Sequence, residues 1–254
     1  MSKADPPRST EAPVLTRRFP ARHASPCDDC TARTLSFCHV LDDQEFARLS
    51  AIVSARSFET GQTIVQEGDE AEYLLNVTSG TLKIFRALPD GRVQIVGFLN
   101  EGDFLGVPAT SGYGVSAEAV TPVQMCAFPR RSFDRLLNEY PTLEHRLFEL
   151  ATNEVAAARD HMLLLGRKTA RERVASFLLT MAQKRPCGHG ASAESRVSLP
   201  MARTEIADYL GLTIETVSRT LSALRKENII ALESANDVVL SRLDALRLIA
   251  AGDA

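Results

Sequence analysis

Short apolar runs separated by turn-forming residues fill the chain between about positions 41 and 133. The runs cover 62–66, 73–78, 81–86, 93–99 and 123–128. Pro89, Asp90 and Gly91 stand between two of these runs and are typical of a tight hairpin turn. Closely spaced runs of this length are typical of antiparallel strands, so this part of the chain is predicted to form a compact barrel or roll.

Beyond Tyr140 the apolar positions change to a helical spacing, and Pro141 suits the first turn of a helix. Two apolar stripes share this helix. The first stripe consists of Leu143, Leu147 and Leu150. The second recurs at alternating three- and four-residue steps and consists of Phe148, Ala151, Val155, Ala158, Met162 and Leu165. One stripe can face the roll while the other faces a second chain, but a helix buried on two sides of a monomer satisfies the same spacing.

Positions 202–224 have the pattern of two short helices that meet at Gly211. The first helix has an apolar inner face, Thr213 can cap the second helix through its hydroxyl, and the second helix packs on the first. The inner positions are Ile206, Ala207, Leu210, Val217, Leu221 and Leu224. The apolar runs 229–232 and 238–240 are then predicted to form a two-stranded wing.

The outward face of the second helix suits the reading of DNA. It carries Glu215, Thr216, Ser218, Arg219 and Ser222. Arginine can pair with guanine O6 and N7, and glutamate can accept a hydrogen bond from cytosine N4. An ordinary helical hairpin with a solvated polar face is the alternative. Helix, glycine turn, capped helix and wing together favour a winged helix-turn-helix.

Composition and net charge limit the partners that the chain can have. The chain has 254 residues, of which 44% are hydrophobic and 24% charged, as in one large or two modest globular domains. A net charge of -3 argues against a general nucleic-acid coat, so any DNA contact must be local. No apolar run approaches the roughly 20 residues that cross a bilayer. We therefore expect a cytoplasmic protein without membrane contact, with a flexible tail at 1–26.

Five cysteines are an odd number for such a protein and favour metal binding or reactivity over disulfides. Cys27 and Cys30 are followed after seven residues by Cys38, and Cys126 lies far along the chain. Four thiolates can hold a [4Fe–4S] cluster. A structural zinc, with His39 or His23 replacing one thiol, and independent free thiols are the alternatives. The fifth, Cys187, lies in a predicted loop at 184–195 and is expected to be incidental.

Three segments resemble one known family. Positions 209–219, Tyr-Leu-Gly-Leu-Thr-Ile-Glu-Thr-Val-Ser-Arg, are very similar to the recognition motif of the fumarate-and-nitrate-reduction (FNR) regulators. Positions 162–168 and 171–174 resemble the end of their dimerisation helix. From Cys27 onward the chain thus resembles the CRP/FNR family. The resemblance implies an α+β fold with a cyclic-nucleotide-binding-like β-roll and cluster segment at 27–138, a dimerisation helix at 139–168 and a winged helix-turn-helix at 169–254.

The same resemblance implies roles for particular residues. It places Glu215, Thr216, Ser218 and Arg219 on a palindromic DNA operator resembling TTGAT-N4-ATCAA, and it assigns the stripe from Phe148 to Leu165 to a homodimer seam. The cysteines look like a Cys-x2-Cys-x7-Cys variant of the FNR set, in which Cys27, Cys30, Cys38 and Cys126 hold an oxygen-responsive [4Fe–4S] cluster. RNA polymerase is an implied partner, and the implied function is transcription activation of anaerobic or microaerobic genes.

Two further classes of function are disfavoured. Cyclic-nucleotide binders of this family pair Gly-Glu with a following Arg-Ser or Arg-Thr, whereas this chain has Gly102-Asp103 and then Val115-Ser116-Ala117. A phosphate buried beside Val115 would lack its cation, so no cyclic nucleotide is expected. An iron–sulphur redox enzyme is the contrasting class. The chain has no dinucleotide or phosphate-loop glycine motif and no Gly-x-Ser-x-Gly elbow, so we expect no enzyme activity.

Overall fold

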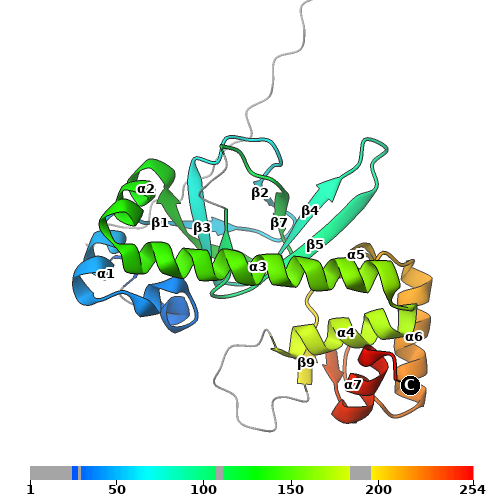
Figure 1. The fold of residues 1–254 in the computed structure, drawn as a ribbon. Helices are drawn as coiled ribbons and strands as arrows, with labels where there is room; N and C mark the ends of the chain where they lie inside the picture. The colour runs from blue at the N-terminus through cyan, green and yellow to red at the C-terminus, as the bar shows by residue number, and fades with distance from the viewer. Residues whose placement is uncertain (1–24, 28–29, 107–110, 184–195, 254) are drawn as a thin grey trace, which may run out of the picture.

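The computed structural model describes residues 25–27, 30–106, 111–183 and 196–253. The predicted tail, apart from residues 25 and 26, and the 184–195 loop with Cys187 lie outside the described residues, as does His23. Figure 1 shows a roll of strands at one end, the helix α3 running along the molecule, and a second, largely helical domain at the other end.

Two four-stranded antiparallel sheets form the roll. The first has the order β1-β8-β3-β6 and the second β2-β7-β4-β5. Their bounds are Ser54–Phe58 (β1), Thr63–Val65 (β2), Tyr73–Ser79 (β3), Leu82–Ala87 (β4), Val93–Leu99 (β5), Phe104–Leu105 (β6), Ser116–Ala119 (β7) and Val123–Pro129 (β8). The five strands predicted from the apolar runs are confirmed, and β4 and β5 form the hairpin around Gly91.

Strand alternation gives the first sheet two different faces. Leu75 and Val77 of β3 point into the roll, where they pack with apolar residues of both sheets. Leu74 of the same strand points outward and packs with Phe128 of β8 in a second cluster. Short helices cover this outer face. They are η1 (Thr31–Thr34), η2 (Phe37–Val40), α1 (Asp43–Ser50) and α2 (Arg130–Glu139).

Helix α3 spans Pro141–Arg167, with Pro141 in its first turn as predicted. Leu143 and Leu147 of the first stripe are buried in the outer cluster of the roll. All ten residues from 151 to 160 are exposed. The two stripes therefore have different surroundings within this chain, because only the first stripe packs against the roll.

The C-terminal domain has one apolar core built by helices and a small sheet. Its elements are α4 (Ala170–Gln183), β9 (Arg196–Ser198), α5 (Arg203–Leu210), α6 (Ile214–Lys226), β10 (Ala231–Leu232), β11 (Asp237–Val239) and α7 (Leu243–Ala251). The predicted two-stranded wing has a third strand, with the order β10-β11-β9. The reason is that Val197 of β9 pairs with Val238 and both side chains are buried in the core.

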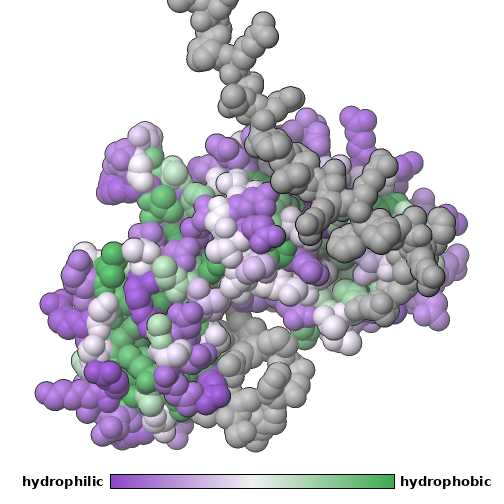
Figure 2. Space-filling model, turned by 180° about the vertical axis from the view of Figure 1, so that it is seen from behind, coloured by the Kyte–Doolittle hydropathy of each residue, from purple (hydrophilic) through white to green (hydrophobic). Residues whose placement is uncertain are grey.

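The roll and the C-terminal domain touch through β4 and β5. The Phe98 ring lies 5.5 Å from the Tyr209 ring and 6.4 Å from the Phe177 ring. Gln94 donates from Nε2 to the carbonyl oxygen of Asp208 at 2.7 Å. Seen from behind, hydrophobic and hydrophilic side chains interleave on the C-terminal domain (Figure 2). No described helix is long and apolar enough to cross a membrane.

Candidate cysteine centre and DNA-reading helix

Cys126 lies in the middle of β8, on the outer face of the first sheet. It pairs with Ala55 of β1 on one side and Asn76 of β3 on the other. Its side chain is buried in the outer cluster, among aromatic and aliphatic residues. A cysteine in this position is held by two neighbouring strands and is accessible only to what packs over the sheet.

The segment with the other three cysteines is docked over that face by Phe37, the neighbour of Cys38. The Phe37 ring is buried, with ring centroids 5.5 Å from Phe104, 5.7 Å from Phe128 and 6.0 Å from Phe133. Edge-to-face aromatic contacts of this kind add to the stabilisation from burial alone. Since Phe128 is two residues from Cys126, Phe37 brings the N-terminal segment to the same part of the sheet.

Two of the four described thiols, Cys126 and Cys38, have raised pKa values. Burial raises the pKa of Cys126 to about 12, and the thiolates of Cys27, Cys30 and Cys38 add to that rise. Burial likewise raises the pKa of Cys38 to about 11, opposed by a hydrogen bond from Ser36 and increased by Cys27 and Cys30. Bound metal is what makes such buried thiols ionise, because a coordinating thiol loses its proton.

None of the four described cysteines forms a disulfide, and Cys27 and Cys126 are buried. Among the described residues, no three His, Cys, Asp or Glu side chains converge as ligands of a single metal ion. The Nδ1 atom of His39, one candidate substitute ligand, lies 2.7 Å from the carbonyl oxygen of Ser36. The four predicted cysteine ligands are thus described in the structure, with Cys126 in β8 and the other three in the N-terminal segment.

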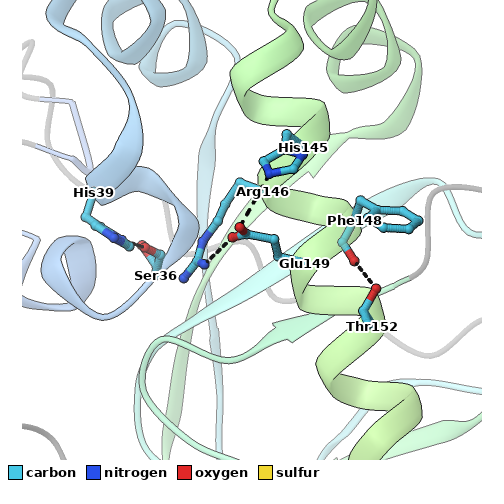
Figure 3. A network of polar contacts seen from close by, with 7 residues as sticks. All are labelled: Ser36, His39, His145, Arg146, Phe148, Glu149 and Thr152. Atoms are coloured by element: carbon cyan, nitrogen blue, oxygen red, sulfur yellow. Dashed lines mark hydrogen bonds and ion pairs between the residues drawn. The ribbon is translucent and has the colours of Figure 1, made fainter.

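The cysteine segment also touches the long helix. Figure 3 shows Arg146 and Glu149 on the side of α3 that faces Ser36 and His39, while Phe148 points away. Arg146 donates from Nη1 to Oε2 of Glu149 at 2.7 Å, and His145 places Nε2 3.5 Å from the other carboxylate oxygen. The contact itself is apolar, because Phe37 and Cys38 pack in the same cluster as Leu143 and Leu147 of α3.

The predicted DNA-reading helix has the expected local structure. Gly211 ends α5 with φ +60°, and the Thr213 hydroxyl caps α6 by accepting a 3.2 Å hydrogen bond from the Thr216 backbone N–H. The inner positions predicted from spacing are all buried: Ile206, Ala207, Leu210, Val217, Leu221 and Leu224. A second helix that is fixed at its start and along its inner side presents a defined outer face.

That outer face carries the predicted contact residues. Glu215, Ser218 and Arg219 are exposed, and Thr216 is half-buried. Arg219 donates from Nη2 to the Thr216 hydroxyl at 3.4 Å. Hydrogen bonds from its own backbone N–H and from Thr213 lower the pKa of Glu215, so its carboxylate is ionised at neutral pH. The face thus offers one fixed anion and one cation a single turn apart.

Arg173 links the reading domain to α3, a role that the sequence analysis did not predict. Its guanidinium donates to the carbonyl oxygens of Leu165 and Lys168, at the end of α3, at 2.8 Å each. It also donates to the Leu210 carbonyl at 2.9 Å, at the end of α5. One side chain therefore joins the last turns of two helices that lie far apart in sequence.

The second stripe of α3 is mostly open to solvent. Phe148 is 70% exposed, Val155 50% and Met162 72%, and Ala151 and Ala158 between them are exposed as well. Leu165 differs, because it is half-buried against the core of the C-terminal domain. Leu163, which the stripe prediction omitted, is 56% exposed. Large apolar side chains aligned on an exposed helix mark a protein interface.

Comparisons with known families cover both domains. The model of the cyclic nucleotide-binding domain matches residues 55–140. The model of the Crp-like helix-turn-helix domain matches residues 172–249. The solved structure of FixK2 from Bradyrhizobium japonicum is similar to this chain with a TM-score of 0.73 and 35% identity, over 78% of this chain and 97% of that one.

Curated relatives are similar over most of their length. The nitrogen fixation regulation protein FixK of Bradyrhizobium diazoefficiens is 44% identical over 206 residues, which cover 81% of this chain and 86% of that protein. The transcriptional activator protein FnrL of Cereibacter sphaeroides is 40% identical, over 89% of this chain and 92% of its own. The fumarate and nitrate reduction regulatory protein of Salmonella typhimurium is 32% identical, with coverages of 88% and 90%.

Proposed function

The chain belongs to the Crp/FNR family of transcription regulators, and we propose that it is the kind of member controlled by an iron–sulphur cluster. Cys27, Cys30, Cys38 and Cys126 are the proposed ligands of one [4Fe–4S] cluster. The loaded protein binds a palindromic operator as a homodimer and activates genes for anaerobic or microaerobic growth. Exposure to oxygen degrades the cluster and ends DNA binding.

One observation carries this proposal. Cys126, in the middle of a roll strand, is near enough to Cys27, Cys30 and Cys38, more than eighty residues earlier, for those thiols to add to the rise of its pKa that burial causes. Buried thiols are costly to ionise unless a metal neutralises them. Four thiols gathered at one place are the ligand set of a cluster, in which each iron takes one protein ligand.

A cluster in this place would supply four iron–thiolate bonds that oxygen can destroy. The residues of the chain do the rest. In the loaded protein, Cys27, Cys30 and Cys38 are tied to Cys126, so the segment around Phe37 is fastened to β8 more firmly than by aromatic packing alone. The fastened segment holds the Arg146 side of α3 in place. Loss of the bonds leaves Phe37 as the main anchor and releases that constraint.

Two chains must associate for the operator to be read. The exposed stripe of Phe148, Ala151, Val155, Ala158 and Met162, with Leu165 at its end, is the proposed seam. Ala151 and Ala158 allow close approach of two helices. A dimer places two copies of α6 on half-sites about one DNA turn, roughly 34 Å, apart. Glu215, Thr216, Ser218 and Arg219 then contact a sequence resembling TTGAT-N4-ATCAA, and RNA polymerase is a further proposed partner.

The first experiment identifies the ligand of the centre. The protein is purified anaerobically, its absorption spectrum is recorded, and iron, sulphide and zinc are measured. We expect a straw-brown cluster spectrum with four iron atoms per chain. Single Cys→Ser changes at 27, 30, 38 and 126 should each lower iron retention, and Cys187→Ser serves as the matched control with full iron. One zinc per chain, or full iron in Cys126→Ser, contradicts the proposed ligand set.

The second experiment tests the switch. Sedimentation and operator band shifts are compared before and after air exposure while the cluster is followed by its absorption. Dimer fraction and operator affinity should fall together with the cluster. A destroyed cluster with unchanged dimer fraction and affinity would refute the switch, even if the ligand assignment is right.

A further inference from the structure

A buried asparagine stands directly beside Cys126. In the antiparallel pair of β3 and β8, Asn76 is the register partner of Cys126, and on its other side it pairs with Phe104 of β6. Asn76 shares the outward parity of Leu74 in β3, and Leu74 packs in the same outer cluster as Cys126. Residues directly opposite in such a pair have Cβ atoms about 5 Å apart. The side chains of Asn76 and Cys126 are therefore neighbours on the same face of the sheet.

The hydrogen bonds of this asparagine are incomplete. Its side chain is only 2% exposed. Its Nδ2 atom donates to the Val77 carbonyl at 3.3 Å, and its Oδ1 atom has no hydrogen-bond partner. A buried amide oxygen without a partner is costly, whereas leucine has nearly the same size and would carry no such cost. Packing alone does not account for a polar residue at this position.

A side-chain amide can hydrogen-bond to a cysteine sulfur both as a thiol and as a thiolate. A thiol can donate a weak hydrogen bond through S–H, and the amide oxygen can accept that hydrogen bond. A thiolate only accepts, and the amide N–H can donate to it. Rotation of the amide about its last side-chain bond exchanges the two roles without moving the backbone. Hydrogen bonds to a metal-bound sulfur change the affinity of the site for its metal and the reduction potential of a bound cluster.

We propose that Asn76 is a positioning residue for Cys126, whose sulfur it hydrogen-bonds through its side-chain amide. The inference rests on the proposed function, since it assumes that Cys126 is a cluster ligand. In the loaded protein the amide N–H donates to the Cys126 thiolate and withdraws negative charge from it. Less charge on the sulfur makes the cluster harder to oxidise, so that air destroys it more slowly.

The test compares Asn76→Leu with the parent protein, both loaded anaerobically. The readouts are the half-life of the cluster absorption in air and the reduction potential of the cluster. We expect the cluster to be lost about tenfold faster in Asn76→Leu, because one hydrogen bond to a charged sulfur is removed. The reduction potential should fall, since the reduced and more negative cluster loses a donor. Thermal unfolding of the cluster-free chain should be unchanged or shifted to higher temperature, because the unsatisfied amide is gone.

Two further variants separate this role from a general effect on folding. Asn76→Ala leaves a cavity and should unfold at a lower temperature, yet it should shorten the cluster half-life as Asn76→Leu does. Thr81→Val is the matched control: it removes another buried polar group, whose hydroxyl donates to Asn100 Oδ1 at 2.8 Å, and should lower folding stability with the cluster half-life unchanged.

The outcomes distinguish the two proposals. Parental half-life and potential in both Asn76 variants would overturn the inference and leave the cluster assignment standing. An equal shortening in Thr81→Val would also overturn it, because the effect would then follow folding stability. A parent protein that takes up no iron would remove the proposed function, and the inference with it.

Discussion

Two glycines with the same backbone conformation have different surroundings. Gly102 has φ +92° and Gly91 has φ +86°, a region that favours glycine in both cases. A Cβ atom at Gly102 would lie 2.8 Å from Leu35 Cβ and 2.9 Å from the Leu35 carbonyl oxygen. A Cβ atom at Gly91 would have nothing within 4 Å. Of these two glycines, only Gly102 lies where the absence of a side chain lets the cysteine segment approach the roll.

Gly102→Ala should consequently displace the segment from Thr31 to Val40. Gly91→Ala is the control and should lower the free energy of unfolding by about 1 kcal/mol from backbone strain alone. Gly102→Ala should cost about 2–3 kcal/mol, because the clash adds to the strain. Denaturant unfolding measures both values, and hydrogen exchange at 31–40 reports the displacement. Equal costs in the two variants would show that the close approach to Leu35 is unimportant.

Arg219 is an exposed cation on the outer face of the reading helix, and its loss should affect DNA binding alone. Arg219→Ala should relax the preference at one base pair of each half-site, since an arginine–guanine pair is worth about 1–3 kcal/mol of discrimination. Folding should be unchanged because the side chain is exposed. Arg92→Ala removes the same charge from the β4–β5 hairpin and is the matched control. Band shifts on operator and scrambled DNA measure the effect; equal discrimination in parent and Arg219→Ala would exclude base reading by Arg219.

At the scale of elements, two opposite sides of α3 are expected to differ, because only one of them belongs to the proposed seam. Met162 and Asn153 are nine residues apart, which is two and a half helical turns, so they lie on opposite sides of the helix. Both are exposed in the single chain. Glutamate at either position adds the same charge to the same helix, but only Met162 belongs to the proposed seam.

Met162→Glu should therefore raise the dissociation constant of the loaded dimer by at least about tenfold, because burying an unpaired carboxylate in an apolar seam is costly. Asn153→Glu should leave association unchanged. Both variants should keep the circular dichroism of the parent, since neither side chain is buried in the chain. Sedimentation equilibrium checks the prediction, and equal dimer fractions in both variants would place the seam elsewhere.

At the scale of the whole molecule, the long helix is joined to the DNA-binding domain by Arg173 and by the half-buried His161. The His161 ring of α3 lies 4.3 Å from the Tyr209 ring of α5. Both ring nitrogens of His161 are buried without a hydrogen-bond partner. Burial therefore lowers the pKa of His161 below its ordinary value of 6.5, because the charged form loses hydration.

This pKa shift makes the free energy of unfolding depend on pH. Below pH 6.5 the unfolded chain binds a proton at His161 that the folded chain resists, so the free energy of unfolding rises with pH in that window. The contribution is complete above pH 6.5 and is lost as the pH falls toward the lowered folded value. His161→Phe should flatten the dependence between pH 5 and 6.5, whereas His145→Gln, at an exposed position on α3, should retain it. Denaturant titrations at fixed protein concentration measure both slopes; equal slopes in parent and His161→Phe would contradict the prediction.

Local patterns in the sequence determined the elements of this protein. Apolar runs and turn residues predicted five of the eight strands of the roll and missed β1, β6 and β7. The spacing around Gly211 and Thr213 predicted the two helices of the DNA-binding motif together with their inner sides. These features depend on residues a few positions apart. Periodicity, capping and turn chemistry act over that range, so a single sequence is sufficient to predict them.

Only the tertiary structure decided what covers each face. Spacing left the second stripe of α3 open to two readings, and the structure exposes most of it while turning Leu165 toward the C-terminal core. It also added β9 to the wing and set Phe37 and Asn76 around Cys126. These contacts join residues that are far apart in sequence. Periodicity tells which residues share a face, but the partner of that face depends on how the whole chain packs.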